Sequence, residues 1–331
     1  MKMNTLRFIY ALVLFSPILL FARQKKDVVH PGVEIPYNPW FTGTFLTPTP
    51  INMKPKHPAI EPSITIFWNY GTYNDNWEIE TGNSSVTINP YLDFQLAFTE
   101  RTGVEIQVQS FTTIRDGNST SGFADTNVLF GYQVSNDQKN SWIPDFRLLL
   151  EVVFPTGKYD KLDPQKKFDD ATGQGAFFIG PNLAFQKLFY LPNNFFILHW
   201  ALAYLYPTEA HIKNYSIYGG GKGTRGRIRP GQYFSAFIAG EYSLSQKLVL
   251  GLEANFFYQL STSEFKGKRG FQKDKKPASV GIGASSQLML LPEIQYNFDS
   301  HSGIIAGGWF SVLGRNTTAY AAGFLAYLYV F

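Results

Sequence analysis

The stretch VTINPYLDFQLAFT, residues 86–99, alternates between apolar and polar side chains, and this alternation decides the fold. Successive residues of a strand point to opposite faces of a sheet, whereas an amphipathic helix repeats its apolar residues about every 3.6 positions. The stretch therefore predicts a strand with one apolar face and one mostly polar face. The two faces are Val86, Ile88, Pro90, Leu92, Phe94, Leu96 and Phe98 against Thr87, Asn89, Tyr91, Asp93, Gln95, Ala97 and Thr99.

The same alternation continues along the chain on both sides of this stretch. In residues 146–154, for example, Arg147 and Glu151 alternate with large apolar side chains, and Glu253 does so in residues 248–260. Most of the runs exceed the roughly 9 to 11 residues with which a tilted strand crosses a bilayer. About twelve runs follow this pattern: 62–71, 84–99, 103–114, 122–135, 142–156, 173–187, 194–207, 232–245, 247–261, 280–298, 303–314 and 317–331.

The connections between these runs alternate in length. Short ones lie at 100–102, 136–141, 188–193, 245–246 and 299–302, and the outer set between them lies at 72–83, 115–121, 157–172, 208–231, 262–279 and 314–316. Bacterial barrels have an even number of strands, short periplasmic turns and longer outer loops. We therefore predict an all-β protein, a transmembrane antiparallel β-barrel of about twelve strands over residues 62–331. A soluble secreted β-sandwich would also alternate, but its strands would be about 5 to 6 residues long.

Both ends of the chain indicate export to the bacterial outer membrane. Lys2 and Arg7 accompany an uncharged apolar stretch and Ala22 offers a cleavage site, so residues 1–22 are expected to be a signal peptide. Residues 326–331 form an aromatic strand that ends in Phe331, the feature by which the barrel-assembly machinery recognises its substrates. We expect localisation in the outer membrane of a Gram-negative cell, with membrane lipid and lipopolysaccharide as neighbours.

The composition is typical of a protein that faces lipid. Aromatic residues make up 17% of the chain and charged residues only 16%, so lipid or a very large core must cover the rings. The net charge of +4 falls to about +2 without the leader, which predicts no nucleic-acid partner. The chain has no cysteine, which excludes disulfides and a lipid anchor attached through a thioether.

Residues 23–61 differ from the rest because they are rich in proline and show no periodicity. One interpretation is a periplasmic tail or a leading strand in extended conformation. The other is a plug folded back into the lumen, because several large apolar side chains would otherwise lack a partner. These side chains are Trp40, Phe41, Phe45 and Leu46.

The polar face of the barrel strands is acidic, with Arg147 as its one clear cation. An isolated buried carboxylate is costly, so either water fills the interior or cations reach it from elsewhere. Two outer loops, within 211–229 and 266–276, are basic and either fold inward or meet lipopolysaccharide phosphates. The other residues expected to line the lumen are Asp93, Glu105, Asp125, Glu151, His199, Glu241, Glu253 and Glu293.

No enzyme motif stands out. A lipid hydrolase needs a histidine and a serine on one face, yet the same-face neighbours of His199 are Ile197 and Ala201. The other histidines have no metal-ligand spacing, so we predict neither a metal nor a cofactor. The glycine-rich run 219–226 resembles a phosphate-binding loop, but no helix is expected after it, and we interpret it as a flexible loop.

Two motifs resemble an outer-membrane family named after the meta-pathway of phenol degradation. They are SGFADTNV at residues 121–128 and PDFRLLLEVVFPTGKY at residues 144–159, followed by Gly173-Gln174-Gly175. Ala124 stands where that family more often has glycine. The resemblance implies passage of small apolar or aromatic molecules across the outer membrane.

We therefore expect a passive channel and not an enzyme. Its specificity would arise from the width of the lumen, its acidic wall and whatever fills the bore. Two alternatives remain open at this point: an outer-membrane lipid hydrolase, and a structural or adhesive surface barrel.

Overall fold

The computed structural model describes residues 40–138 and 141–331 of this chain. The expected signal peptide, and residues 23–39 of the proline-rich segment, lie outside the described residues. Within the described ranges, no helix is long and apolar enough to cross a membrane. The secondary structure there is almost entirely strand, with one short 3-10 helix, η1 (Pro164–Lys166).

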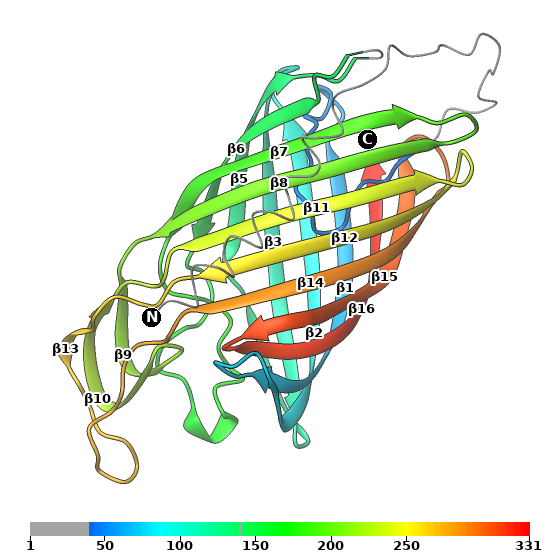
Figure 1. Ribbon diagram of the computed structural model, residues 1–331. Coiled ribbons are helices and arrows are strands. Elements are labelled where there is room, and N and C mark those ends of the chain that lie inside the picture. The colour runs from blue at the N-terminus through cyan, green and yellow to red at the C-terminus, as the bar shows by residue number, and fades with distance from the viewer. Residues whose placement is uncertain (1–39, 139–140) are drawn as a thin grey trace, which may run out of the picture. The chain divides into compact units, whose positions relative to one another are not determined.

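The strands form a closed antiparallel barrel (Figure 1). β4 pairs with only the outer half of β3, and β5 pairs with the other half. β4 and β5 therefore share one position in the ring, and the described barrel has twelve strand positions. Pairing of β2 with both β1 and β3 closes the ring. The strands are β1 (Ala59–Tyr73), β2 (Ile79–Ala97), β3 (Thr102–Arg115), β4 (Asn118–Phe123), β5 (Thr126–Ser135), β6 (Asp145–Phe154), β7 (Phe178–Tyr190), β8 (Phe195–Pro207), β11 (Tyr233–Ser243), β12 (Leu248–Gln259), β14 (Ser285–Asn297), β15 (Ser302–Arg315) and β16 (Thr317–Val330).

The predicted twelve-stranded antiparallel barrel is thus confirmed, but the predicted outer connections 72–83 and 115–121 are shorter than expected. Residues 72–83 were expected to form an outer loop, but β1 and β2 continue into it and leave only residues 74–78 between them. The side chain of Asn74 explains this tight end, because its Oδ1 accepts hydrogen bonds from the backbone N–H groups of Asn76 and Glu78. Such a side-chain turn replaces the loop.

The two faces of the wall differ as the alternation predicts. Large apolar side chains are exposed all around the outside, for example Trp68 at 69% and Leu252 at 55%. A belt of this kind needs a bilayer to cover it. Inward-facing side chains are closely packed, and both Leu149 and Glu241 are fully buried. The interior is therefore filled largely by side chains.

The outer loops build a second, three-stranded sheet from β9 (Ala210–Ser216), β10 (Gly219–Ile228) and β13 (Lys266–Lys268). The interpretation of residues 219–226 as a flexible loop is therefore wrong, since this run belongs to β10. Glycines carry no alternating side chains, and one of the two strands that pair with this run, β13, comes about 40 residues later in the sequence; the other is β9. The long loops and this sheet mark what we call the outer end of the barrel, and the short turns mark the inner end.

Candidate functional site

The segment before β1 crosses the interior of the barrel between opposite walls. At one side, the backbone N–H of Thr42 donates to Gln295 Oε1 of β14 at 3.2 Å. At the other, the backbone N–H of Asn52 donates to Gln133 Oε1 of β5 at 2.7 Å. β14 and β5 are six positions apart in the ring of twelve, so these walls face one another. We call residues 40–52 the crossing segment.

One carboxylate holds the middle of the crossing segment. Glu253 of β12 accepts hydrogen bonds from the backbone N–H groups of Phe45 (2.7 Å), Leu46 (3.0 Å) and Thr47 (2.7 Å). It also accepts one from the Thr47 hydroxyl at 2.6 Å. Glu253 is almost completely buried. Four donors that converge on one ionised group form charge-assisted hydrogen bonds, which are stronger than neutral ones.

The apolar side chains of the crossing segment pack against aromatic residues of the inner wall. The Phe45 ring is stacked on Phe324, with 4.1 Å between centroids, and meets Trp309 edge-on at 6.3 Å. Leu46 packs on the same cluster. The Trp309 indole Nε1 is buried and has no hydrogen-bond partner among the described residues. We call this surface the aromatic wall: Phe67, Phe257, Trp309, Tyr320 and Phe324.

The other two apolar residues expected in a plug lie nearer the inner rim. The backbone N–H of Trp40 donates to the carbonyl of Gln246, in the turn between β11 and β12. The Lys247 ammonium lies 5.7 Å from the centre of the Trp40 ring, within reach of a cation–π interaction. Phe41 is partly buried. Of the four apolar residues expected in a plug, Phe45 and Leu46 join the aromatic wall, whereas Trp40 and Phe41 do not.

Four of the residues expected to line the lumen lie together on β2, β3 and β6. Arg147 forms a buried ion pair with Glu105. Asp93 accepts a hydrogen bond from the Gln95 amide at 2.7 Å. Glu151 accepts from the amides of Asn127 and Asn182, at 3.1 and 3.4 Å. This group is therefore held by an arginine and by amides, and not by the basic outer loops.

Four more lie on the opposite side, on β8, β11, β12 and β14. The His199 Nε2 lies 2.5 Å from a carboxylate oxygen of Glu241. The Gln295 amide donates to Glu241 at 2.6 Å and to Glu293 at 3.1 Å. Because Gln295 also accepts from Thr42, this network reaches the crossing segment that Glu253 holds. The second ring nitrogen of His199 has no partner among the described residues.

Asp125, the last residue of that set, lies apart from both groups, in the bend between β4 and β5. Its carboxylate accepts the backbone N–H groups of Gly157, at 2.8 Å, and Gln174, at 2.7 Å. A Cβ on Gly173 would lie 2.3 Å from the Asp125 carboxylate, so only glycine fits there. The two sequence motifs thus meet in one clasp, which ties the loop after β6 to the bend before β5.

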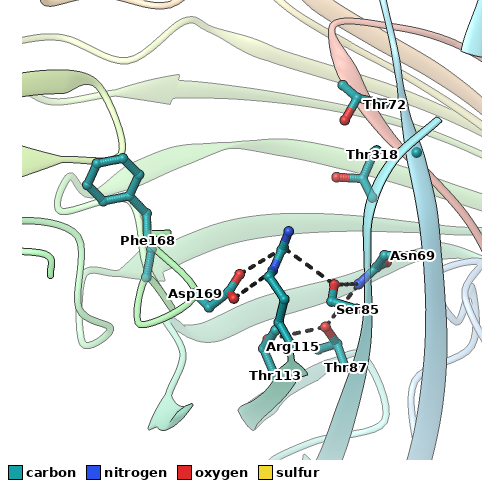
Figure 2. A pocket seen from close by; sticks show the side chains of 12 residues that line it. Asn69, Thr72, Ser85, Thr87, Thr113, Arg115, Phe168, Asp169 and Thr318 are labelled. Carbon is teal, nitrogen blue, oxygen red and sulfur yellow. Dashed lines mark hydrogen bonds and ion pairs between the residues drawn. The ribbon is translucent and has the colours of Figure 1, made fainter. Parts of the chain in front are cut away.

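A polar pocket of about 350 Å³ lies in the outer half of the barrel (Figure 2). At its centre the Arg115 guanidinium binds Asp169 with two hydrogen bonds, at 2.8 and 2.9 Å. The Asn69 amide donates to the hydroxyls of Ser85 and Thr87, both at 3.1 Å. Sequence reasoning missed this pocket because Asp169 comes from a loop 54 residues beyond Arg115. The remaining labelled lining residues are Thr72, Thr113, Phe168 and Thr318.

The arrangement provides surfaces for contact with small molecules. In the described part of the chain, no three His, Cys, Asp or Glu side chains are grouped so that they could hold a metal ion. Hydroxyl and amide groups line the outer pocket. Aromatic rings and carboxylates surround the crossing segment deeper in the barrel.

Comparison with known proteins gives a family and a fold. Residues 59–327 match the sequence model of the family described as "Putative MetA-pathway of phenol degradation". No curated protein sequence matches the chain.

Among solved structures, the COG4313 outer membrane channel from Pseudomonas putida F1 has a TM-score of 0.63 at 12% identity, over 87% of this chain and 100% of that one. The Pseudomonas putida toluene transporter TodX gives a TM-score of 0.34 at 10% identity, over 83% and 90% of the two chains. The first likeness establishes that this fold is that of an outer-membrane β-barrel.

Proposed function

The chain belongs to the family described as the putative MetA-pathway of phenol degradation, and on this premise we propose that it is a passive outer-membrane channel for small apolar or aromatic molecules. The two groups of polar residues around the crossing segment line the path of the solute through the barrel. The crossing segment is the plug that fills this path. The exposed apolar belt of the channel is in contact with membrane lipid.

One observation carries the solute class. The phenyl ring of Phe45 stacks on Phe324 inside the barrel, in the place that the ring of an aromatic solute would take. Stacked and edge-on aromatic pairs contribute about 0.5 to 1.5 kcal/mol beyond the burial of their area. A solute that enters from the outer pocket would compete with Phe45 for the aromatic wall, and it would leave after the crossing segment has moved.

We propose no catalytic step. A hydrolase would need a nucleophilic hydroxyl that is hydrogen-bonded to His199. Among the described residues, the His199 ring instead forms its hydrogen bond with Glu241. Recognition of β16 by the barrel-assembly machinery, through the exposed ring of Phe331 at its inner end, is also part of the proposal.

Swelling of proteoliposomes in neutral sugars tests whether the barrel conducts solutes. We expect slow swelling with the full chain and faster swelling with a variant that lacks residues 23–52, a deletion that leaves β1 intact. Absence of swelling above protein-free liposomes in both proteins would favour a structural or adhesive barrel. Release of fatty acids from the lipid would favour a hydrolase.

Current recordings in planar bilayers test the solute class. Phenol and cyclohexanol have one hydroxyl and similar size, but only phenol is aromatic. We expect phenol to interrupt the ion current at lower concentrations than cyclohexanol does. Phe45→Ala should lower the phenol concentration that is required at least about tenfold, because burial of a phenyl ring contributes about 1.5 to 3 kcal/mol. Phe41→Ala is the matched control. Equal effects of the two solutes on every protein would refute an aromatic site.

A further inference from the structure

The second sheet presents a strongly basic face. In its pairing register, Arg225 of β10 lies opposite Lys213 of β9 and Lys268 of β13. Arg227 lies likewise opposite His211 and Lys266. Residues directly opposite one another share a face, as do residues two apart on a strand. All six side chains therefore stand on one face, in two rows of three, and all are exposed.

The two rows differ in their acidic partners. Glu209 lies 3.3 Å from Arg227 and 4.0 Å from Lys266, so the row nearer the barrel is partly neutralised. In the part of the chain that the structure describes, no carboxylate forms an ion pair with Lys213, Arg225 or Lys268. With strands about 4.8 Å apart, this unmatched row of three cations spans roughly 10 Å.

The opposite face of the sheet fixes the direction in which the basic face points. Ala210, Ile212 and Ile228 are buried in one apolar cluster with Phe178 and Leu205, which face the interior of the barrel from β7 and β8. The sheet therefore turns its apolar side toward the barrel axis. The sheet lies beyond the outer ends of β8 and β11 (Figure 1). Its basic side, opposite the apolar one, therefore points away from the axis.

Arg229 links this basic side to the lipid-facing wall. Its guanidinium donates to the Tyr206 hydroxyl at 2.6 Å and lies 5.6 Å from the centre of that ring. Tyr206 is an exposed aromatic residue at the outer end of β8, the position of the interfacial aromatic girdle. The cations continue from the girdle along the same side of the chain, because buried or half-buried residues alternate with Arg229, Arg227 and Arg225. These three arginines extend over about 13 Å in the direction away from the membrane.

We propose that this basic face binds phosphate groups of the lipopolysaccharide molecules that surround the barrel in the outer leaflet. Arginine and lysine are the residues that bind phosphate, arginine with two hydrogen bonds at once. A soluble anionic solute would be guided by cations that point toward the axis, whereas these point toward the surrounding lipid. The proposal needs the outer-membrane location but not solute passage, so it stands or falls separately from the channel function.

Binding of labelled lipid A to the full chain in detergent micelles tests the proposal, with fluorescence anisotropy as the readout. The probe is used in its bisphosphorylated form and in a form without phosphates. The first variant removes the unmatched row: Lys213→Gln, Arg225→Gln and Lys268→Gln. The matched control removes three cations from the tip of the neighbouring loop, off the sheet: Lys273→Gln, Lys275→Gln and Lys276→Gln. The heat-dependent shift of barrel proteins on gels shows that each variant is folded.

Each cation near an anionic membrane surface changes affinity about fivefold, so the row variant should bind bisphosphorylated lipid A roughly a hundredfold more weakly. The tip variant should change it less than about threefold, and all proteins should bind the phosphate-free form alike. Equal weakening by both variants would overturn the proposal, because net charge alone would then explain binding. So would a wild-type protein that does not distinguish the two forms, or a row variant that alters only the conductance of anionic solutes.

Discussion

Replacing Glu253 by glutamine should release the crossing segment without changing the fold of the barrel. The carboxylate accepts two hydrogen bonds on each of its oxygens, from Phe45 and Leu46 on one and from Thr47 on the other. In Glu253→Gln an NH₂ group takes the place of one oxygen and cannot accept, so two of the four bonds are lost.

The size of the effect follows from the kind of bond. Hydrogen bonds to charged groups contribute about 1.5 to 3 kcal/mol each. The Thr47 hydroxyl can turn to accept from the new amide, so the net loss is about 2 to 3 kcal/mol. Since 1.4 kcal/mol is a factor of ten, the ratio of released to docked crossing segment should rise about 30- to 140-fold.

Single-channel recording in planar bilayers measures this ratio as the time spent in high-conductance states. The matched control is Glu151→Gln, which also removes one interior carboxylate. The side chains that donate to Glu151, Asn127 and Asn182, belong to the wall and not to the crossing segment. Both variants should lower the preference for cations, whereas only Glu253→Gln should lengthen the open time. Equal open times in the wild type and Glu253→Gln, or equal lengthening in both variants, would refute the reasoning.

Three further predictions concern the barrel wall, the clasp at Asp125 and the outer loops. Gly131→Ala would place a Cβ 2.4 Å from Arg147 Nε and push the arginine away from Glu105. Loss of a buried ion pair costs about 3 to 5 kcal/mol, so the midpoint of thermal unfolding should fall. The control Gly82→Ala should leave the midpoint unchanged, because its Cβ would meet nothing within 4 Å. Asp125→Ala leaves two backbone N–H groups unpaired, at about 1 to 3 kcal/mol each, so protease should cut within residues 157–177 faster than in the wild type, and unchanged cleavage would exclude the clasp. Hydrogen bonds from Asn316 and Arg315 lower the pKa of Asp75 below its usual 3.8. This contact therefore stabilises the outer loops above pH 3.8, and the stabilisation is lost as the pH falls through the lowered pKa of the folded protein. Carboxyl NMR titration should show a midpoint for Asp75 that rises in Arg315→Gln, and a midpoint at 3.8 in both proteins would contradict the contact.

The barrel could be predicted because most of its strands show the alternation of apolar and polar residues within their own sequence. Alternation over 103–114 gave β3 to within one residue at each end, Thr102–Arg115. The segments that were missed lack such a signal. β4 is a short polar strand. β10 begins in a glycine run, and one of its two partner strands, β13, lies in another loop.

The site was predictable only in its ingredients. Period two places Glu253, Glu241 and Glu293 on the inner face, but it cannot say which donors meet them. Three of the four donors to Glu253 are backbone N–H groups, the fourth is the Thr47 hydroxyl, and all lie more than 200 residues away in sequence. The family motif is informative in a different way, because Asp125, Gly157 and Gly173 meet in a loop clasp and not on the proposed path of the solute.

The acidic interior poses one physical problem, and the crossing segment answers part of it. Carboxylates in a closely packed interior need donors, and the basic outer loops were one possible source. The structure turns the basic face of β9, β10 and β13 away from the axis, while Glu253 receives backbone N–H groups of residues 45–47 instead. Such donors carry no net charge, so they leave the interior negative when the crossing segment is docked. A channel that opens by releasing this segment exposes Glu253 to water, and the ion current should therefore become more selective for cations as it grows.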